Sequence, residues 1–192
     1  MADSIYRESV AYHEAGHIVV AAAQGLRLSR RGIHLDSDGR GMAYYKYRKT
    51  KRFGPPESSR ESTIVATYAG LIAQKEFHPD CSIKGADTDG DSIGELLREM
   101  DAEDDSPFLH LASDAAKVEL EKESERLLKI HWAAIVAVAT ALLGEPDTIR
   151  YSDEPEPYWS LLQYEKMLSA ERIIEIIKNF DIYASLWDHL RD

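Results

Sequence analysis

The stretch "AYHEAGHIVVAAAQG", residues 11–25, places two histidines and a glutamate inside a run that otherwise has the composition of a buried helix. Apolar and aromatic side chains recur at spacings of three and four from residue 4 to about residue 24, which predicts an amphipathic helix. On that helix, His13 and His17 share the apolar face, one turn apart. Burying polar groups costs free energy unless a partner compensates them, so this stretch calls for a chemical explanation.

His13, Glu14 and His17 form the pattern His-Glu-x-x-His. The spacing brings the two imidazoles to one side of a helix, close enough to bind one metal ion. A zinc ion held by two neutral imidazoles and one further ligand lowers the pKa of a bound water to about 7, and a neighbouring glutamate can take its proton. The pattern therefore predicts Zn²⁺ as cofactor, His13 and His17 as ligands and Glu14 as catalytic base. The alternative is a pair of hydrogen-bonded core histidines, which the adjacent glutamate disfavours.

The rest of the sequence predicts a mainly α (α+β) fold in one domain, residues 1–192. An apolar and aromatic run on either side of the turn "DSDGRG" predicts a small β-hairpin over residues 31–48, the only sheet expected. Helices are expected over four further regions: from Ser59 or Ser62 to before Pro79, over "SIGELLREM" (92–100), from about 108 to 143, and as two or three short helices in the tail 158–190.

Composition limits the partners and the location. The 192 residues carry 34 acidic and 23 basic side chains, and the net charge of -11 disfavours nucleic acid or an anionic membrane as partner. Cys81 is the single cysteine and the start "MADSIYRES" does not have the pattern of a signal peptide, so a cytoplasmic location is expected. The longest apolar runs, 18–23 and 132–143, are shorter than the ~20 residues of a membrane-spanning helix, so no span is expected.

Four segments resemble the zinc-peptidase domain of the FtsH-type ATP-dependent metalloproteases. "AYHEAGH" matches its metal-binding motif, "ATYAGLIAQKEF" (66–77) resembles its second helix, and "WAAIVAVATALLGEPDTI" (132–149) is similar to a late helix. "KGADTD" (84–89) resembles the Gly-Ala-x-x-Asp segment that supplies the third zinc ligand. The resemblance covers most of residues 5–150. It implies a helical zincin-like domain with a small β-hairpin near the active site, and hydrolysis of peptide bonds.

The sequence also departs from that family. It contains no Gly-Lys dipeptide that could build a P-loop, so no ATPase module is expected, and any ATPase is expected to be a separate partner. Ile83 and Lys84 replace the family's Thr-Thr, and Gly90 stands where an apolar residue is usual. Because the rings of the relatives depend on their ATPase part, the oligomeric state is left open.

The third ligand needs a further argument because Asp87, Asp89 and Asp91 lie close together. A helix extended back from "DGDSIGELLREM" puts Asp89 on the face of Ile93, Leu96, Leu97 and Met100, whereas Asp87 and Asp91 point away and would cap the helix. A carboxylate on a core-facing stripe is costly unless a cation receives it. Asp89 is therefore the predicted third ligand. Cys81 is expected to be a small buried residue, and the other five histidines have no ligand spacing: His34, His78, His110, His131 and His189.

The leading hypothesis is a soluble zinc peptidase that cleaves small or unfolded substrates without ATP. The alternative from another class is a non-catalytic, zinc-containing adaptor or regulator, although a structural site would have four protein ligands and no base. A third option is hydrolysis of a non-peptide amide. If the hairpin strand "GMAYYKY" has a free edge beside the metal, an extended peptide could pair with it. The basic residues of 46–52 are expected to be a solvated loop, or else a site for an acidic partner or peptide.

Overall fold

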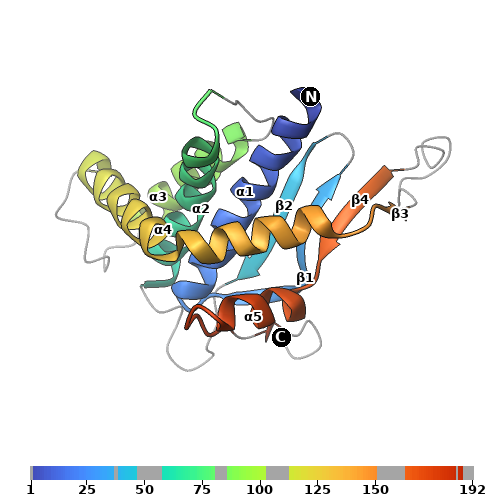
Figure 1. Ribbon diagram of the computed structural model, residues 1–192. Coiled ribbons are helices and arrows are strands. Elements are labelled where there is room, and N and C mark those ends of the chain that lie inside the picture. The colour runs from blue at the N-terminus through green and yellow to red at the C-terminus, as the bar shows by residue number, and fades with distance from the viewer. Residues whose placement is uncertain are drawn as a thin grey trace, which may run out of the picture.

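A long helix, α1 (Ala2–Ala23), occupies the centre of the fold. The computed structural model describes residues 2–36, 39–46, 58–80, 86–102, 113–150, 163–184 and 186–187. The β-sheet lies on one side of α1 and helix α2 (Ser58–Phe77) on the other, with α3 (Ala86–Ala102) packed on α2 (Figure 1). The predicted fold class is confirmed, because the described chain is mainly helical with a smaller sheet.

The predicted hairpin is part of a larger sheet. Its strand order is β2-β1-β4-β3 with antiparallel neighbours, and β5 runs parallel to the start of β1. The strands are β1 (Arg27–Asp36), β2 (Gly41–Lys46), β3 (Thr148–Arg150), β4 (Gln163–Leu168) and β5 (Leu186–Trp187). The predicted hairpin is confirmed by the antiparallel pairing of β1 with β2, but the expectation that it forms the whole sheet was wrong, because β4, β3 and β5 belong to the same sheet.

The tail also differs from the expectation of two or three short helices over 158–190. In the part of the tail that the structure describes, one helix, α5 (Ala170–Lys178), follows strand β4. Strand β4 is held by pairing with β1, in which Ile33 lies opposite Leu168 and Leu35 opposite Lys166. This pairing joins segments more than 100 residues apart. The local pattern of "QYEKML" therefore does not predict a strand, because the strand is stabilised by pairing with a distant segment.

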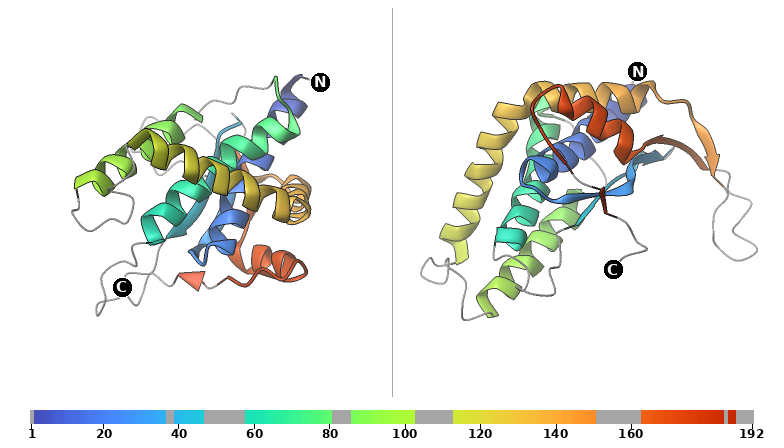
Figure 2. Two further views of the ribbon diagram at one scale, coloured as in Figure 1. Left: turned by 90° about the vertical axis from the view of Figure 1, so that its left-hand side faces the viewer. Right: turned by 90° about the horizontal axis from the view of Figure 1, so that it is seen from below.

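Helix α4 (Ser113–Gly144) bends near its middle, so that its first half follows α2 and its second half crosses α1 (Figure 2). By length and composition α4 could span a membrane, because its residues 115–144 include a window with a mean hydropathy of 1.8 that is 39% buried inside the structure. A core helix of a soluble protein passes the same test. The length of continuous apolar runs is therefore not enough to exclude a membrane-spanning helix, and by length and composition α4 remains a candidate for one.

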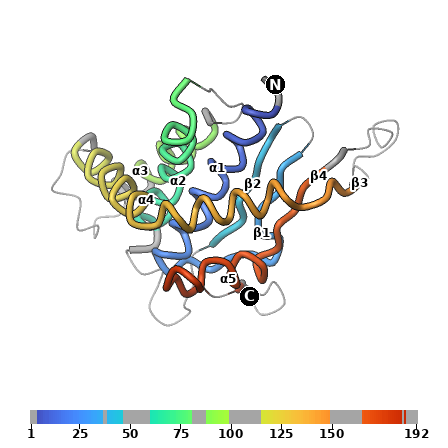
Figure 3. Tube along the Cα trace, viewed as in Figure 1, coloured from blue at the N-terminus to red at the C-terminus, as the bar shows by residue number. Residues whose placement is uncertain are grey.

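Helix α1 lies among the sheet, α2 and α4 (Figure 3), and it contributes many of the buried hydrophobic residues of the core. Ile18 and Val19 pack with residues of the sheet, α4 and α5, whereas Val20 and Ala21 pack with residues of α2 and α3. Most residues of α1 from Ser9 to Ala22 are consequently buried. A side chain on this helix has its position set by packing on both sides, which suits a site that needs accurate geometry.

Candidate metal centre

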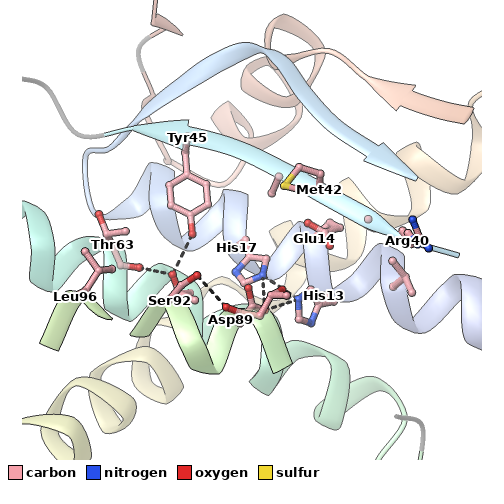
Figure 4. A pocket seen from close by; sticks show the side chains of 15 residues that line it. His13, Glu14, His17, Arg40, Met42, Tyr45, Thr63, Asp89, Ser92 and Leu96 are labelled. Carbon is pink, nitrogen blue, oxygen red and sulfur yellow. Dashed lines mark hydrogen bonds and ion pairs between the residues drawn. The ribbon is translucent and has the colours of Figure 1, made fainter. Parts of the chain in front are cut away.

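The three residues predicted as ligands lie together. His13 and His17 project from the middle of α1 toward Asp89 in the first turn of α3 (Figure 4). Asp89 Oδ2 is 2.8 Å from His13 Nε2 and 3.2 Å from His17 Nε2, and the two Nε2 atoms are 2.9 Å apart. Asp89 lies more than 70 positions after the two histidines in the sequence, yet the three donor atoms meet at one point, as a group that could hold a metal ion.

The orientation of His17 leaves its Nε2 atom free to act as a ligand. Its Nδ1 atom lies 2.9 Å from the carbonyl oxygen of Ala66 on α2. A carbonyl can only accept a hydrogen bond, so Nδ1 carries the proton and Nε2 of the neutral ring presents a lone pair toward His13 and Asp89. Backbone carbonyls commonly orient metal-binding histidines in this way.

The three separations fit a small cation with N and O ligands. In a tetrahedral zinc site with bonds of about 2.0–2.1 Å, ligand atoms lie about 3.3 Å apart. The observed separations of 2.8, 2.9 and 3.2 Å are close to this value. Asp89 Oδ2 is buried, and its close neighbours are the Nε2 atoms of the two imidazoles, so the three potential ligand atoms face one another as a shared cation would require. Catalytic zinc sites commonly have three protein ligands, such as two imidazoles and a carboxylate, and leave the fourth position to water or substrate.

Glu14 lies beside these donors and does not belong to the group of three. Its side chain is almost fully buried, with 5% of the residue exposed, and its carboxylate accepts a hydrogen bond from the backbone N–H of Ala43 on β2. Gly41 on the same strand lies directly against the carboxylate, and a Cβ atom there would come within 2.5 Å of Glu14 Cγ. Strand β2 therefore holds Glu14 in place at the edge of the centre.

Charge and burial alter the acid–base behaviour of the group. Burial raises the pKa of the Glu14 carboxyl, and the charges of the two imidazoles offset this only in part. Burial alone would raise the pKa of Asp89, but its contacts with His13 and His17 outweigh burial and hold that pKa below its usual range. Burial lowers the pKa of His17, whereas Asp89 and Glu14 raise it to about 9. A buried carboxylate, Glu14, and a partly buried one, Asp89, thus create a site that favours positive charge, whether protons or a cation.

Small residues on α2 make room for the histidines. A Cβ atom on Gly70 would collide with the His17 imidazole, and one on Gly16 would lie 2.5 Å from the carbonyl oxygen of Ala69. Helices α1 and α2 are therefore closely packed at Gly16 and at Ala69–Gly70. This packing allows α1 and α2 to approach closely enough for Ala66 to orient His17.

The centre opens into a cleft of about 570 Å³. One wall is strand β2, which is an edge strand because, in the described part of the chain, only β1 pairs with it. Tyr45 on this wall forms a hydrogen bond with Thr67 of α2, with 3.3 Å between the two oxygens. Burial raises the pKa of Tyr45, so its hydroxyl stays protonated. Neither residue is predicted as part of the site from the sequence, because the local pattern around Tyr45 and Thr67 does not reveal that they face each other.

The register argument for Asp89 agrees with the structure, but the expected role of Asp91 does not. Helix α3 begins at Ala86, six residues before the predicted helix, so Asp89 is already in its first turn and Asp91 lies inside the helix, exposed. Asp91 therefore does not cap α3. The side chain of Asp87, the loop residues 47–52 and Cys81, His110 and His189 lie outside the described residues.

No family model matches this chain, and no curated protein resembles it significantly in sequence. The geometry of the centre is therefore the evidence for a function. The resemblance to FtsH-type peptidases is based only on the four sequence segments quoted above.

Proposed function

We propose that this protein is a zinc-dependent metallopeptidase, similar to the peptidase domain of the FtsH-type proteases. One observation carries the proposal: buried Glu14 stands beside three converging donor atoms, from His13, His17 and Asp89, at the wall of an open cleft. A site that only bound a metal would need neither the open cleft nor the adjacent carboxylate.

The residues of this chain have separate roles in the proposed reaction. His13, His17 and Asp89 would hold the zinc ion, which when bound polarises the substrate carbonyl and makes water more acidic. Glu14 takes a proton from the attacking water while the oxygen of that water forms a bond to the carbonyl carbon of the substrate. Glu14 then delivers that proton to the leaving nitrogen as the C–N bond breaks. The hydrogen bond from Ala43 keeps the Glu14 carboxylate in position for both transfers.

Strand β2, with which only β1 pairs in the part of the chain that the structure describes, supports an extended peptide as substrate. A peptide that adds to this edge is held by backbone hydrogen bonds, which depend little on sequence. A folded protein cannot offer an extended segment without first unfolding. We therefore propose that flexible peptides and unfolded chains are cleaved without ATP, and that any folded substrate depends on a separate ATPase partner.

The test compares the wild-type protein with Glu14→Gln, which keeps the shape of the side chain and loses the basic oxygen. Zinc content should be about one ion per chain in both, measured by elemental analysis, because Glu14 is not one of the three donors. Cleavage of a flexible peptide should fall by about 10²–10⁴-fold, the usual contribution of a general base.

His17→Ala is the matched control, because it should lose both zinc and activity. Equal peptide cleavage by the wild type and Glu14→Gln would rule out the proposed base. Zinc binding with no cleavage by the wild type would favour the adaptor or regulator.

A further inference from the structure

The cleft ends at a cationic side chain that the proposed mechanism does not use. Arg40 is exposed, lines the cleft and lies next to Gly41 at the start of β2. Figure 4 shows Arg40 at one end of the cleft and Tyr45 at the other, with Glu14 between them. Of the cleft-lining side chains that the structure describes, Arg40 is the only one from lysine or arginine.

Hydrogen bonds fix the backbone at Arg40, whereas its guanidinium can interact with a ligand in the cleft. The Arg40 N–H donates to Asp36 Oδ1 at 2.7 Å, and the Asp36 N–H donates to the Arg40 carbonyl at 2.9 Å. The Asp36 carboxylate is thus engaged by the backbone. Within the described chain, no carboxylate pairs with the Arg40 guanidinium. A cleft-lining arginine whose guanidinium has no ion-paired carboxylate among the described residues is available to an external carboxylate.

The direction of a peptide bound along β2 follows from strand pairing and from the position of Glu14. Antiparallel pairing is the more stable of the two modes, and a peptide antiparallel to β2 runs toward Arg40 at its C-terminal end. Independently, the nitrogen that Glu14 protonates belongs to the residue after the scissile bond. Glu14 lies under Gly41, on the Arg40 side of the three donors (Figure 4). Both arguments place the C-terminal product near Arg40.

We infer that Arg40 determines specificity by binding a carboxylate that the substrate carries after the scissile bond. Arg40 precedes Gly41, which lies against the Glu14 carboxylate, so with a strand rise of about 3.3 Å per residue the bound carboxylate falls within about two residues of the scissile bond. It can be an acidic side chain or the free C-terminus of the peptide. This inference rests on the proposed peptidase function and adds the substrate class.

The experiment uses a neutral, flexible, C-terminally amidated peptide whose cleavage site has been mapped by mass spectrometry. Glu, Gln or Lys is then placed at each of the two positions after the cleaved bond. A further neutral peptide ends there with a free carboxylate, which separates the two sources of charge. The wild type should show a kcat/KM about fivefold higher for Glu, or for the free C-terminus, than for the amidated Gln peptide, as for a partly exposed ion pair.

Variants assign this preference to one side chain. Arg40→Gln should remove it, and Arg40→Glu should favour the Lys peptide. The control Arg172→Gln removes an exposed arginine of α5 that does not line the cleft, and it should keep the wild-type preference. Cleavage by the wild type without a preference, or a preference that survives in Arg40→Gln, would overturn the inference and leave the peptidase function standing.

A binding measurement separates the two proposals. In the Glu14→Gln background, fluorescence anisotropy should show about fivefold tighter binding of the Glu peptide than of the Gln peptide, and adding Arg40→Gln should abolish the difference. If the wild type cleaves nothing but this difference is found, the peptidase proposal fails and the carboxylate site stands. If binding shows no dependence on Arg40, the carboxylate site is wrong.

Discussion

At the scale of single residues, the centre depends on which atom each side chain presents. His17 presents Nε2 because the carbonyl of Ala66 accepts a hydrogen bond from Nδ1. Asp89 presents Oδ2 because its place in the first turn of α3 directs it at both imidazoles. Glu14, one residue from His13, points to Ala43 instead and stays outside the donor group. Under the proposed function, these adjacent residues would have different chemical roles, His13 as ligand and Glu14 as base.

The carboxylates of α3 provide a test at this scale. Asp89→Asn should weaken zinc binding by more than about tenfold, because loss of even a supporting group around a metal costs about 10–100-fold in affinity. Asp91→Asn removes the same charge two residues later, at an exposed position, and should leave affinity nearly unchanged. Competition with a chromophoric chelator measures both. The opposite ranking would show that the assigned register of α3 is wrong.

At the scale of elements, the close contact between α1 and α2 places the histidines. Gly16 lies against the backbone of Ala69 and the side chain of Ala73, with 2.7 Å between a Cβ built on Gly16 and that of Ala73. A glycine inside a helix usually costs about 1 kcal/mol relative to alanine. Here the cost is offset by the approach of the two helices, which brings Ala66 to His17.

A pair of glycine substitutions tests this contact. Gly16→Ala should lower the free energy of unfolding by about 1–2 kcal/mol, because the cost of overpacking exceeds the gain in helix propensity. Gly94→Ala, in α3, meets no atom within 4 Å and should raise it by about 0.5–1 kcal/mol. Urea denaturation measures both changes. Stabilisation by Gly16→Ala would mean that α1 and α2 are not packed this closely.

At the scale of the whole molecule, the proposed metal would connect parts that have little direct packing. Helix α3, which supplies Asp89, packs chiefly on α2, whereas α1, which supplies both histidines, packs on α2, α4 and the sheet. A bound ion would join α3 to the central helix. It would also bind the native state alone, because the three ligands come together only on folding.

Thermal unfolding measures this coupling. Zinc at about 100 times its Kd should stabilise the protein by about 2.7 kcal/mol, which raises Tm by about 5–10 °C for a chain of this length. A chelator should reverse the shift, and His17→Ala should show almost none. A similar rise in Tm for His17→Ala would place the bound zinc elsewhere on the protein.

The sequence by itself determined the features that depend on local spacing. The i, i+4 pattern predicts that His13 and His17 share a face, and helical periodicity separates Asp89 from its neighbours. The hairpin of residues 31–48 is also local, because its two strands are joined by a short turn. The sequence could not show strand β4, the Ala66 contact of His17, or the placing of Gly41 and Ala43 against Glu14. Only the tertiary structure decided these, because they join segments far apart in the chain, and the stability of such pairings comes from packing and not from local pattern.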